Sequence, residues 1–456
     1  MYETFTLRQK IKQILFLLIP ILITQLGMFS MVFFNTIMSG KYNASDLAGV
    51  AIGSSIWSPI FTGLSGILLA VSPIAAQRFG EKKIKEVSSV LTHGIYLALL
   101  IGVLVIGAGA LFLNPLLDSM KLAPSVRETA HDFLVGLSYG IIPLFIFNAL
   151  RSFIYALGKT RVVMVVLLLA LPVNFFLNYV LIFGKWGFPE LGGGGAGYAT
   201  SFTYFVIAGI TAYIVMTKEP FVNYVQLKQF KVFKWTECRE ILKIGVPMGL
   251  SVFCETSIFA LVTILMSAFS ITTIAAYQSA LNIVAFIYMI PMSISMAQTV
   301  LVGFEVGAKR YKDAKTYSWL GIGLSVLIGG VSGLLIVLFK EEVAGLYSND
   351  PEVIILTAQF LIFGLFFQIA DAIQVTALGA LRGYKDVNIP FVMTLFAYWL
   401  ICLPVGYFLA HKTDLGATGY WIGLTVGLVA AGIALAWRLI HIQKHKFAAV
   451  EMKEVV

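Results

Sequence analysis

Charged residues are scarce in this chain of 456 residues. Asp, Glu, Lys and Arg together make up 12% of it, whereas hydrophobic residues make up 59%. A soluble domain usually contains about 25% charged residues and about half apolar ones, and one soluble core could not bury so much apolar surface. The composition therefore excludes an ordinary soluble protein and indicates a membrane protein.

Cysteine is also scarce, since Cys238, Cys254 and Cys402 are the three in the chain. So few cysteines, and an odd number of them, exclude a secreted scaffold held together by disulfides. Short alternating apolar segments are missing as well. The apolar runs exceed about 20 residues, which excludes a transmembrane β-barrel and indicates helices.

A catalytic constellation is missing too. None of the five histidines has a partner at a metal-ligand spacing. Gly192, Gly194 and Gly197 fit G-x-G-x-x-G, but no strand precedes them, so we do not expect a dinucleotide site. Gly158-Lys159-Thr160 resembles the end of a phosphate-binding loop without its first glycine. The sequence therefore predicts neither an enzyme nor a cofactor, and no ATP drive.

Long apolar stretches recur along the whole chain, and each can cross a hydrocarbon core of about 30 Å as a helix. We expect twelve transmembrane helices, and the predicted fold class is an all-α integral membrane protein. The helices are expected near residues 13–38, 46–74, 89–114, 129–156, 162–184, 195–216, 241–268, 274–303, 316–339, 353–381, 388–410 and 415–437.

Basic residues are unevenly distributed among the segments that join these helices. With the amino terminus in the cytoplasm, 26 of the 32 Lys and Arg residues fall in inner segments and 6 in outer ones. Membrane proteins keep their basic loops on the cytoplasmic side. We therefore expect a multi-pass protein of the cell membrane with both termini in the cytoplasm, which requires an even number of helices.

The two halves of the chain resemble each other at an almost constant offset of 227 residues. Pro20 corresponds to Pro247, and Pro124-Ser125-Val126 corresponds to Pro351-Glu352-Val353. Each half has an even number of helices, so the repeats enter the membrane from the same side, as two pseudo-symmetric six-helix bundles. The predicted organisation is an N-lobe at 1–216, a cytoplasmic linker at 217–240, a C-lobe at 241–440 and a cytoplasmic tail at 441–456. Two such bundles around a cavity are typical of transporters.

Two carboxylates are predicted to lie inside the membrane. Of the 23 acidic residues, Glu255 and Asp371 alone fall near the middle of a predicted helix, and no basic residue is expected at that depth. An acid there costs about 2.5–3.5 kcal/mol on insertion scales, so it usually marks an ion or proton pathway. The alternative is a protonated acid that holds two helices together by hydrogen bonds.

The amino-terminal half has amides and hydroxyls at comparable positions instead of acids. Asn35 and Thr36 lie near the outer end of the first helix, and Asn174 and Asn178 share one face of the fifth. They form a candidate polar cluster, although asparagines also join helices without any further role. The residue 227 positions before Glu255 is Met28, so the two clusters are not copies of each other.

Several stretches together resemble the multidrug and toxic compound extrusion (MATE) family, in its NorM-type branch, over essentially the whole chain. They are Leu47–Trp57, Ala76–Lys82, Pro172–Gly184, Gly245–Glu255, Tyr288–Ser293 and Asp371–Asp386. The resemblance implies two six-helix lobes around a central cleft. It also implies export of amphipathic, often cationic, drugs or toxins against an inward flow of Na⁺ or H⁺.

The resemblance also implies roles for individual residues. Glu255 and Asp371 match the acids that bind the coupling cation, Na⁺ or H⁺, and Tyr288 and Phe259 match aromatic residues beside them. Asn174 and Asn178 match the polar cluster of the N-lobe. Gln278 and Ser55 are then expected in the substrate cleft. Beyond these substrates and the lipid bilayer, we expect no nucleic-acid partner and a monomer.

One position departs from the family pattern. In the stretch Phe34–Gly40 the family normally has Asp where this chain has Asn35. An amide keeps the shape of the carboxyl group but cannot ionise. This departure therefore argues against proton coupling through Asn35, Thr36, Asn174 and Asn178.

Two other functions fit parts of the pattern. A lipid-linked oligosaccharide flippase of related fold would need basic residues inside the cavity, and the sequence places none there. A membrane scaffold without transport activity would not need Glu255 and Asp371 in the membrane.

Overall fold

The computed structural model describes residues 3–225 and 233–454, with side chains as far as His445. The regular structure in this part of the chain is all helical, with no β-strand. The helices are α1 (Leu7–Tyr42), α2 (Ala44–Leu68), α3 (Val71–Gly80), α4 (Ile84–Ser119), α5 (Pro124–Ser138), α6 (Ile141–Ala156), α7 (Thr160–Phe183), α8 (Gly192–Thr217), α9 (Trp235–Leu265), α10 (Ile271–Gly307), α11 (Tyr311–Leu338), α12 (Lys340–Gly345), α13 (Pro351–Gly383), α14 (Asn388–Leu395), α15 (Leu403–Lys412) and α16 (Thr418–Glu454), with short 3-10 helices η1 (Lys185–Gly187), η2 (Phe221–Asn223) and η3 (Met266–Ala268) and a π-helix η4 (Phe396–Cys402).

The predicted membrane spans are confirmed. In the described residues eleven helical segments are long and apolar enough to cross a membrane, and α5 with α6, bent by 51°, makes a twelfth if the pair counts as one span. The fold class, an all-α integral membrane protein, is confirmed with them. The predicted linker at 217–240 is shorter than expected at its end, because α9 already begins at Trp235, and residues 226–232 of it lie outside the described part.

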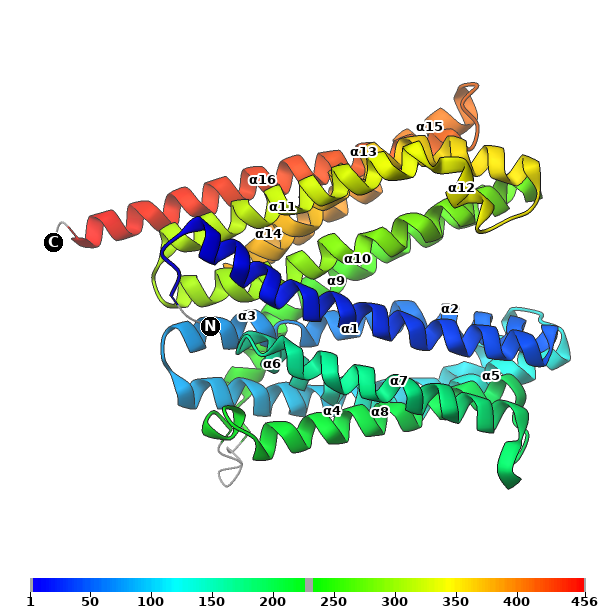
Figure 1. Ribbon diagram of the computed structural model, residues 1–456, viewed down its shortest axis with the longest axis horizontal. Helices are drawn as coiled ribbons and strands as arrows, with labels where there is room; N and C mark the ends of the chain where they lie inside the picture. Colours follow the sequence, from blue (N-terminus) through cyan, green and yellow to red (C-terminus); the bar gives the residue numbers. More distant parts are fainter. Residues whose placement is uncertain (1–2, 226–232, 455–456) are drawn as a thin grey trace. The chain divides into compact units, whose positions relative to one another are not determined.

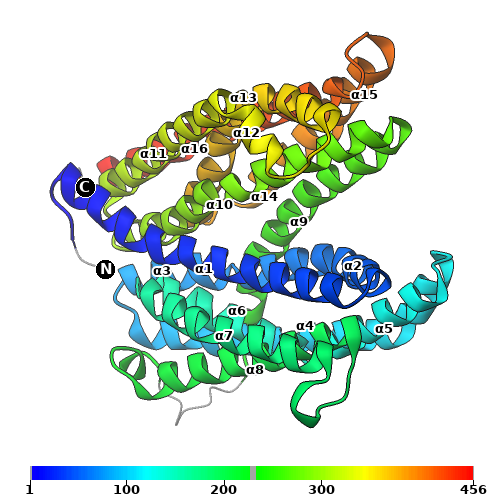
Figure 2. The same cartoon turned by 45° about the vertical axis from the view of Figure 1, so that its right-hand side comes forward.

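The chain divides into two compact units. Unit 1 contains residues 19–249, and unit 2 contains residues 2–18 and 250–456. In unit 1, α7 runs alongside α8 and α4 packs against α6, and in unit 2, α13 runs alongside α11 and α16 (Figures 1 and 2). The unit boundaries fall inside α1 and α9, so the first turns of each of these helices belong to the unit that holds the other repeat.

Unit 1 is held together by close helix contacts. Its apolar core includes Val50 of α2, Phe133 of α5 and Ala196 of α8, each at most 3% exposed. The glycine run that resembled a nucleotide motif begins α8 rather than forming a loop. A Cβ added to Gly197 would overlap the carbonyl oxygen of Phe133, so the small residues let α8 approach α5. Helix packing therefore explains this motif.

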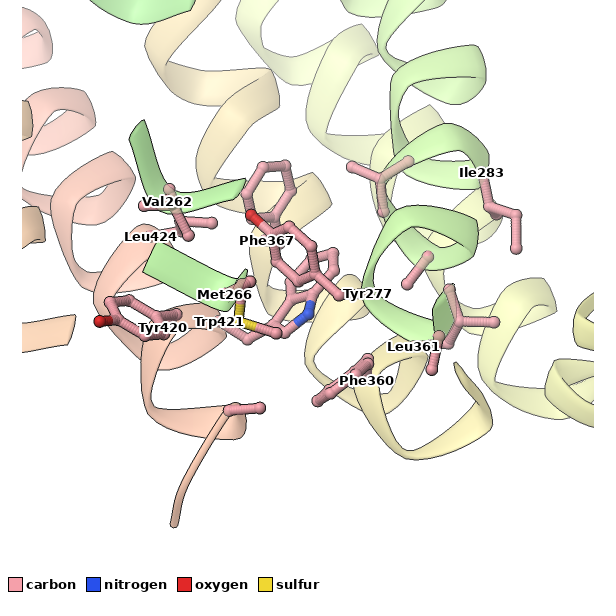
Figure 3. Close-up of a cluster of buried hydrophobic side chains, with 14 of the residues drawn as sticks. Val262, Met266, Tyr277, Ile283, Phe360, Leu361, Phe367, Tyr420, Trp421 and Leu424 are labelled. Atoms are coloured by element: carbon pink, nitrogen blue, oxygen red, sulfur yellow. The ribbon is translucent and has the colours of Figure 1, made fainter. Parts of the chain in front are cut away.

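Unit 2 has an aromatic core around Trp421 of α16, which is fully buried. The ring of Phe360 stacks on Trp421 at 6.2 Å between centroids, and Tyr277 and Phe367 meet it edge-on at 5.8 Å each. Figure 3 shows these rings gathered from α10, α13 and α16. Such packing fixes α13, the helix that carries Asp371, relative to its neighbours.

The π-helix η4 widens the span between α14 and α15. It ends directly before Leu403 and Pro404, and proline has no N–H to donate to the preceding turn. A π-helix, whose hydrogen bonds join residues five apart, accommodates such an interruption, and π-helical turns often occur at functional sites. The wider turns carry Tyr398, which is 1% exposed, inside unit 2.

The start of α9 is anchored within unit 1. Arg78 of α3 forms an ion pair with Glu237 at 2.8 Å and a second one with Glu240, both in the first turns of α9. The backbone N–H of Lys234 also donates to Nε2 of the fully buried His93, at 3.0 Å. These contacts explain why residues before Gly249 belong to unit 1 although the sequence assigns them to the second repeat.

The start of the chain is anchored in unit 2 in a corresponding way. Lys10 forms an ion pair with Asp313 at 2.8 Å, and Arg310 pairs with Glu3 at 2.6 Å and Glu305 at 2.5 Å. Burial alone would lower the pKa of Arg310, but the hydrogen bond from its guanidinium to Glu305 and the nearby carboxylates raise that pKa above its usual value. The Arg310 guanidinium therefore stays charged near neutral pH.

The two anchors are pseudo-symmetric, with the charges reversed. Lys10 and Glu237 are 227 residues apart, and so are Arg78 and Glu305. In unit 1 the arginine, Arg78, belongs to the first repeat, and the acid, Glu237, lies on the incoming helix α9. In unit 2 the acid, Glu305, belongs to the second repeat, and Lys10 lies on the incoming start of the chain. The reversal is partial, because Arg310 of unit 2 also pairs with Glu3 of the incoming segment, as Arg78 pairs with acids in unit 1.

We expect loss of the Arg78 charge to destabilise unit 1. Arg78→Gln leaves two partly buried carboxylates beside each other, and breaking such a pair should lower the free energy of unfolding by about 2 kcal/mol. Thermal unfolding in detergent would measure this. Arg127→Gln, which removes an exposed pair with Asp118, should cost less than about 0.5 kcal/mol. Equal effects of the two substitutions would contradict this role, and Arg78→Glu combined with Glu237→Lys should recover part of the loss.

Candidate functional site

Each unit holds one buried polar cluster, and the first lies between α1, α7 and α8 of unit 1. Asn178 Nδ2 donates to Asn35 Oδ1 at 2.9 Å, and Asn35 Nδ2 donates to Thr200 Oγ1 at 2.8 Å. Asn174 Nδ2 donates to Thr203 Oγ1 at 3.2 Å. These five side chains are at most 6% exposed. The structure therefore brings together Asn35, Asn174 and Asn178 as the sequence suggested.

Two members of this cluster escaped the sequence analysis, and one predicted member is outside it. Thr200 and Thr203 lie three residues apart on α8, and such a spacing is too common in helices to stand out. Thr36 Oγ1 instead donates to the carbonyl of Val32 in its own helix at 3.0 Å. Thr36 is next to Asn35 in sequence, but adjacent helical residues point in different directions.

The second cluster lies within unit 2, on α9, α10 and α13. Tyr288 donates its hydroxyl proton to Glu255 Oε1 at 3.3 Å. Asp371 is 3% exposed, lies within electrostatic range of Glu255 and Tyr288, and has no hydrogen-bond partner for Oδ2. The two acids, 116 residues apart in sequence, thus share the interior of one unit.

Phe259 lies one turn beyond Glu255 on α9. Its ring meets Phe367 of α13 edge-on at 6.2 Å between centroids, which connects it to the aromatic core around Trp421. Phe259 therefore lies on the same helix as Glu255, and its ring packs against this aromatic core.

Further polar groups near the acids were not predicted. Gln374 of α13 is fully buried, and neither its Oε1 nor its Nε2 has a hydrogen-bond partner. The hydroxyl of Tyr398, on the π-helix, is also without a hydrogen bond and lies within electrostatic range of both acids. Buried polar atoms without partners are available to bind a water molecule or an ion. Gln374 could have been found from its spacing of three residues from Asp371, whereas Tyr398 depends on the π-helix.

A basic residue does approach the acids, contrary to the sequence analysis. Arg382, at the inner end of α13, lies within electrostatic range of Glu255 and Tyr288. The sequence placed it in a loop because the apolar run ends at Leu381, but the long side chain reaches back along the helix. Arg382 supplies a positive charge near Glu255.

The two residues expected in a substrate cleft are both exposed. Gln278 lies on α10 and Ser55 on α2, where its hydroxyl donates to the carbonyl of Ala51 at 2.8 Å. They belong to different units. Their exposure makes them accessible, and their assignment to one cleft stays a prediction.

The oxygens around Glu255 and Asp371 suit a monovalent cation or a proton. Hard cations take oxygen ligands, and carboxylates add charge to the carbonyl and hydroxyl oxygens of Gln374 and Tyr398. The described residues contain no group of three or more His, Cys, Asp or Glu side chains that could hold a metal ion. The set thus lacks the several carboxylates with which proteins commonly bind a divalent ion.

Two repeated helical halves with buried acids in one of them define a membrane transporter. The family model MatE matches residues 20–180 and 247–408, and the chain belongs to this family. The chain is 50% identical over 444 residues to the probable multidrug resistance protein NorM of Halalkalibacterium halodurans, covering 97% of each chain. It is 49% identical over 445 residues to the protein of the same name from Bacillus subtilis, covering 97% of this chain and 98% of that one.

Solved structures have the same fold. The crystal structure of a eukaryotic MATE transporter matches with a TM-score of 0.87 at 19% identity, covering 97% of this chain and 99% of that one. A MATE protein crystallised in a bent conformation matches with a TM-score of 0.87 at 21% identity, covering 96% and 97%. The fold predicted from the family resemblance is thereby confirmed.

Proposed function

We propose that this protein exports amphipathic, often cationic, organic compounds in exchange for an inward flow of Na⁺ or H⁺. The observation that carries this proposal is the pair Glu255 and Asp371, which share a buried polar site, with Arg382 near Glu255. Two carboxylates in such a place favour a bound cation or proton. Membership of the MatE family and the names of the close relatives support the proposal that entry of this ion drives drug export.

Exchange follows if the ion and the exported compound favour different conformations, or compete for the same negative charge. A cation between Glu255 and Asp371 neutralises them and allows the acids to stay buried. A positively charged compound is attracted to the two carboxylates only when no cation neutralises them. Binding of the compound and binding of the ion therefore oppose each other. Alternating access then needs only that each ligand stabilises one conformation more than the other.

The N-lobe cluster has a different part in this proposal. Asn35, Asn174, Asn178, Thr200 and Thr203 are neutral at all accessible pH values, so this cluster does not release or take up a proton. It holds α1 against α7 and α8. Coupling therefore depends on the acids of unit 2 alone.

Efflux from proteoliposomes tests the proposal. The purified protein would be reconstituted with a fluorescent cationic dye inside, and a Na⁺ gradient or a pH gradient would be imposed separately. We expect one of the gradients to drive dye out of the vesicles faster than its absence does. Equal efflux with both gradients, with either one or with none would contradict coupled export.

We place the protein in the cell membrane as a monomer, with both termini in the cytoplasm and no cofactor. Cysteines introduced singly at Lys41 and Lys83 should then react with a membrane-impermeant thiol reagent from opposite sides of the membrane, Lys41 from outside. The distribution of Lys and Arg is the physical reason. Because Cys238, Cys254 and Cys402 are native, a chain with these replaced is the background. Labelling of both positions from one side would contradict this topology.

A further inference from the structure

A second buried charge lies in unit 1, and the proposed exchange does not use it. Arg151 is on α6, five residues before its inner end, and is 6% exposed. Its Nη1 lies 3.4 Å from the sulfur of Met28 on α1, and its guanidinium lies 5.8 Å from the centre of the Phe147 ring. Within the described part of the chain it forms no ion pair with an acid.

A guanidinium cannot shed its proton in a protein, so Arg151 stays charged. Thioether sulfur is a weak acceptor, and an aromatic face offsets only part of the cost of taking a cation out of water. Burying a charge without a counter-charge is expensive. Something negative is therefore needed beside Arg151, and the surrounding side chains do not provide it.

The neighbours of Arg151 on α6 are polar and incompletely bonded. Asn148, Arg151, Ser152 and Tyr155 follow the spacing of one helix face and are at most 6% exposed. Arg151 Nε, Ser152 Oγ and Tyr155 Oη each have no hydrogen-bond partner of good geometry, although Tyr155 also lies near Thr24. These three groups are all potential donors, as an anion requires.

Asn148 connects the same face of α6 to α2. Its Nδ2 donates to Ser65 Oγ at 3.2 Å, which leaves Oδ1 without a partner. Oxygen and nitrogen of an amide are interchangeable in such a network, and the Ser65 hydroxyl can donate as well as accept. With the amide turned, Asn148 becomes a fourth donor on this face.

The repeat shows how this face differs from the acid site of unit 2. Met28 and Glu255 are 227 residues apart and occupy corresponding places on α1 and α9. In unit 2 that place carries an acid near Arg382. In unit 1 it carries a sulfur near Arg151, so the arginine there lacks the internal carboxylate.

We propose that the α6 face of Asn148, Arg151, Ser152 and Tyr155, closed by Met28, binds one small monovalent anion, either a chloride ion or a carboxylate carried by an exported compound. Binding of an exported compound's carboxylate rests on the proposed export function, whereas binding of a chloride ion does not. Unit 1 would then hold a negative ligand and unit 2 a positive one.

Chloride binding would be measured by the broadening of the ³⁵Cl NMR signal in solutions of the purified protein. We expect saturable broadening that bromide competes away, and its reduction by about tenfold in Arg151→Gln because a charge-assisted hydrogen bond is lost. Arg127→Gln, which changes an exposed arginine of the same unit, is the matched control and should leave the broadening unchanged. Arg151→Lys keeps the charge but loses the planar donor set, so it should retain part of the signal.

A second variant, Met28→Glu, tests the proposed site even if Arg151→Gln does not fold. It places a carboxylate within reach of Arg151, so it should fill the site from within, preserve folding and abolish chloride broadening. Broadening that persists in a folded Met28→Glu protein would overturn the chloride source.

The carboxylate source has its own readout. Efflux of a zwitterionic compound would be compared with efflux of its methyl ester, which keeps the cation and lacks the carboxylate. We expect Arg151→Gln and Met28→Glu to lower efflux of the acid by about tenfold, as for loss of a charge-assisted hydrogen bond, and to spare the ester. If neither chloride broadening nor the ratio of acid to ester efflux changes in these variants, no anion binds at Arg151. Absence of all efflux in the unaltered protein would instead count against the proposed function and leave the chloride result standing.

Discussion

Glu255→Gln and Asp371→Asn should each lower cation-driven efflux by at least about tenfold, corresponding to a loss of about 1.4 kcal/mol in cation binding. Each substitution keeps the shape of the side chain and removes one negative charge. The remaining acid and the oxygens of Gln374 and Tyr398 would then face Arg382 with too little negative charge to hold a cation. Folding should persist, because a neutral amide costs less to bury than a carboxylate.

The measurement is dye efflux from proteoliposomes under whichever gradient drives the unaltered protein. Glu341→Gln is the matched control, since Glu341 is an exposed acid at the start of α12 in the same unit. Thermal unfolding of all three variants separates loss of coupling from loss of folding. If Glu255→Gln and Asp371→Asn both transported like Glu341→Gln, the acids would not carry the coupling ion.

Substitution of Arg382 provides a second, independent test of this prediction. With one acid removed, the positive charge of Arg382 acts on a single carboxylate, so Arg382→Gln should restore part of the cation affinity of Glu255→Gln. In the unaltered chain, Arg382→Gln should strengthen cation binding and slow cation release. Such opposite effects on binding and turnover are expected for a charge that tunes the site without forming its ligands.

The sequence was enough to predict most of the fold, because the signals are strong and local. Apolar runs of membrane length identify spans without reference to packing. The break within the fourth predicted span, 129–156, is different. There α5 ends at Ser138 and α6 starts at Ile141, with a bend of 51°, and a close approach of Gly140 to Ser201 of α8 accompanies it. That bend depends on a contact 61 residues away, which periodicity does not reveal.

The acids were likewise predictable and their surroundings were not. Glu255 and Asp371 stand out because an acid within an apolar run is rare. Thr200, Thr203 and Gln374 do not stand out, since uncharged polar residues are common in membrane helices. The anchoring of α9 on unit 1 also escaped the analysis, because Arg78, Glu237 and Glu240 look like ordinary residues of inner loops.

Asn35→Asp should make transport depend on pH through unit 1. In the present protein Asn35 Nδ2 donates to Thr200 Oγ1 at 2.8 Å, and Thr200 in turn donates to the carbonyl of Ala196 at 2.8 Å. A protonated carboxyl group at position 35 can donate to Thr200 in the same way. An ionised one has no proton, so Thr200 must turn its hydroxyl toward it and release Ala196.

Ionisation at position 35 therefore reverses the direction of the hydrogen bond between α1 and α8 and removes the one from Thr200 to Ala196 within α8. The exchange changes the balance between conformations of α1 by about 1 kcal/mol, the size of a net hydrogen bond. Pro20 already removes one backbone hydrogen bond from α1, which lowers the cost of bending this helix. The conformation of α1 would then follow pH in the variant and not in the present protein.

The sign of the effect follows from the protonation states. At the acidic end of the range the variant is protonated and should match the present protein. At the alkaline end it should differ in drug affinity by about fivefold, the equivalent of about 1 kcal/mol. Drug affinity measured from pH 5 to 8 at fixed Na⁺ tests this. Thr200→Val in the Asn35→Asp background removes the hydroxyl that must turn, so it should flatten the added pH dependence. Identical pH profiles for the present protein and Asn35→Asp would show that position 35 has no part in coupling.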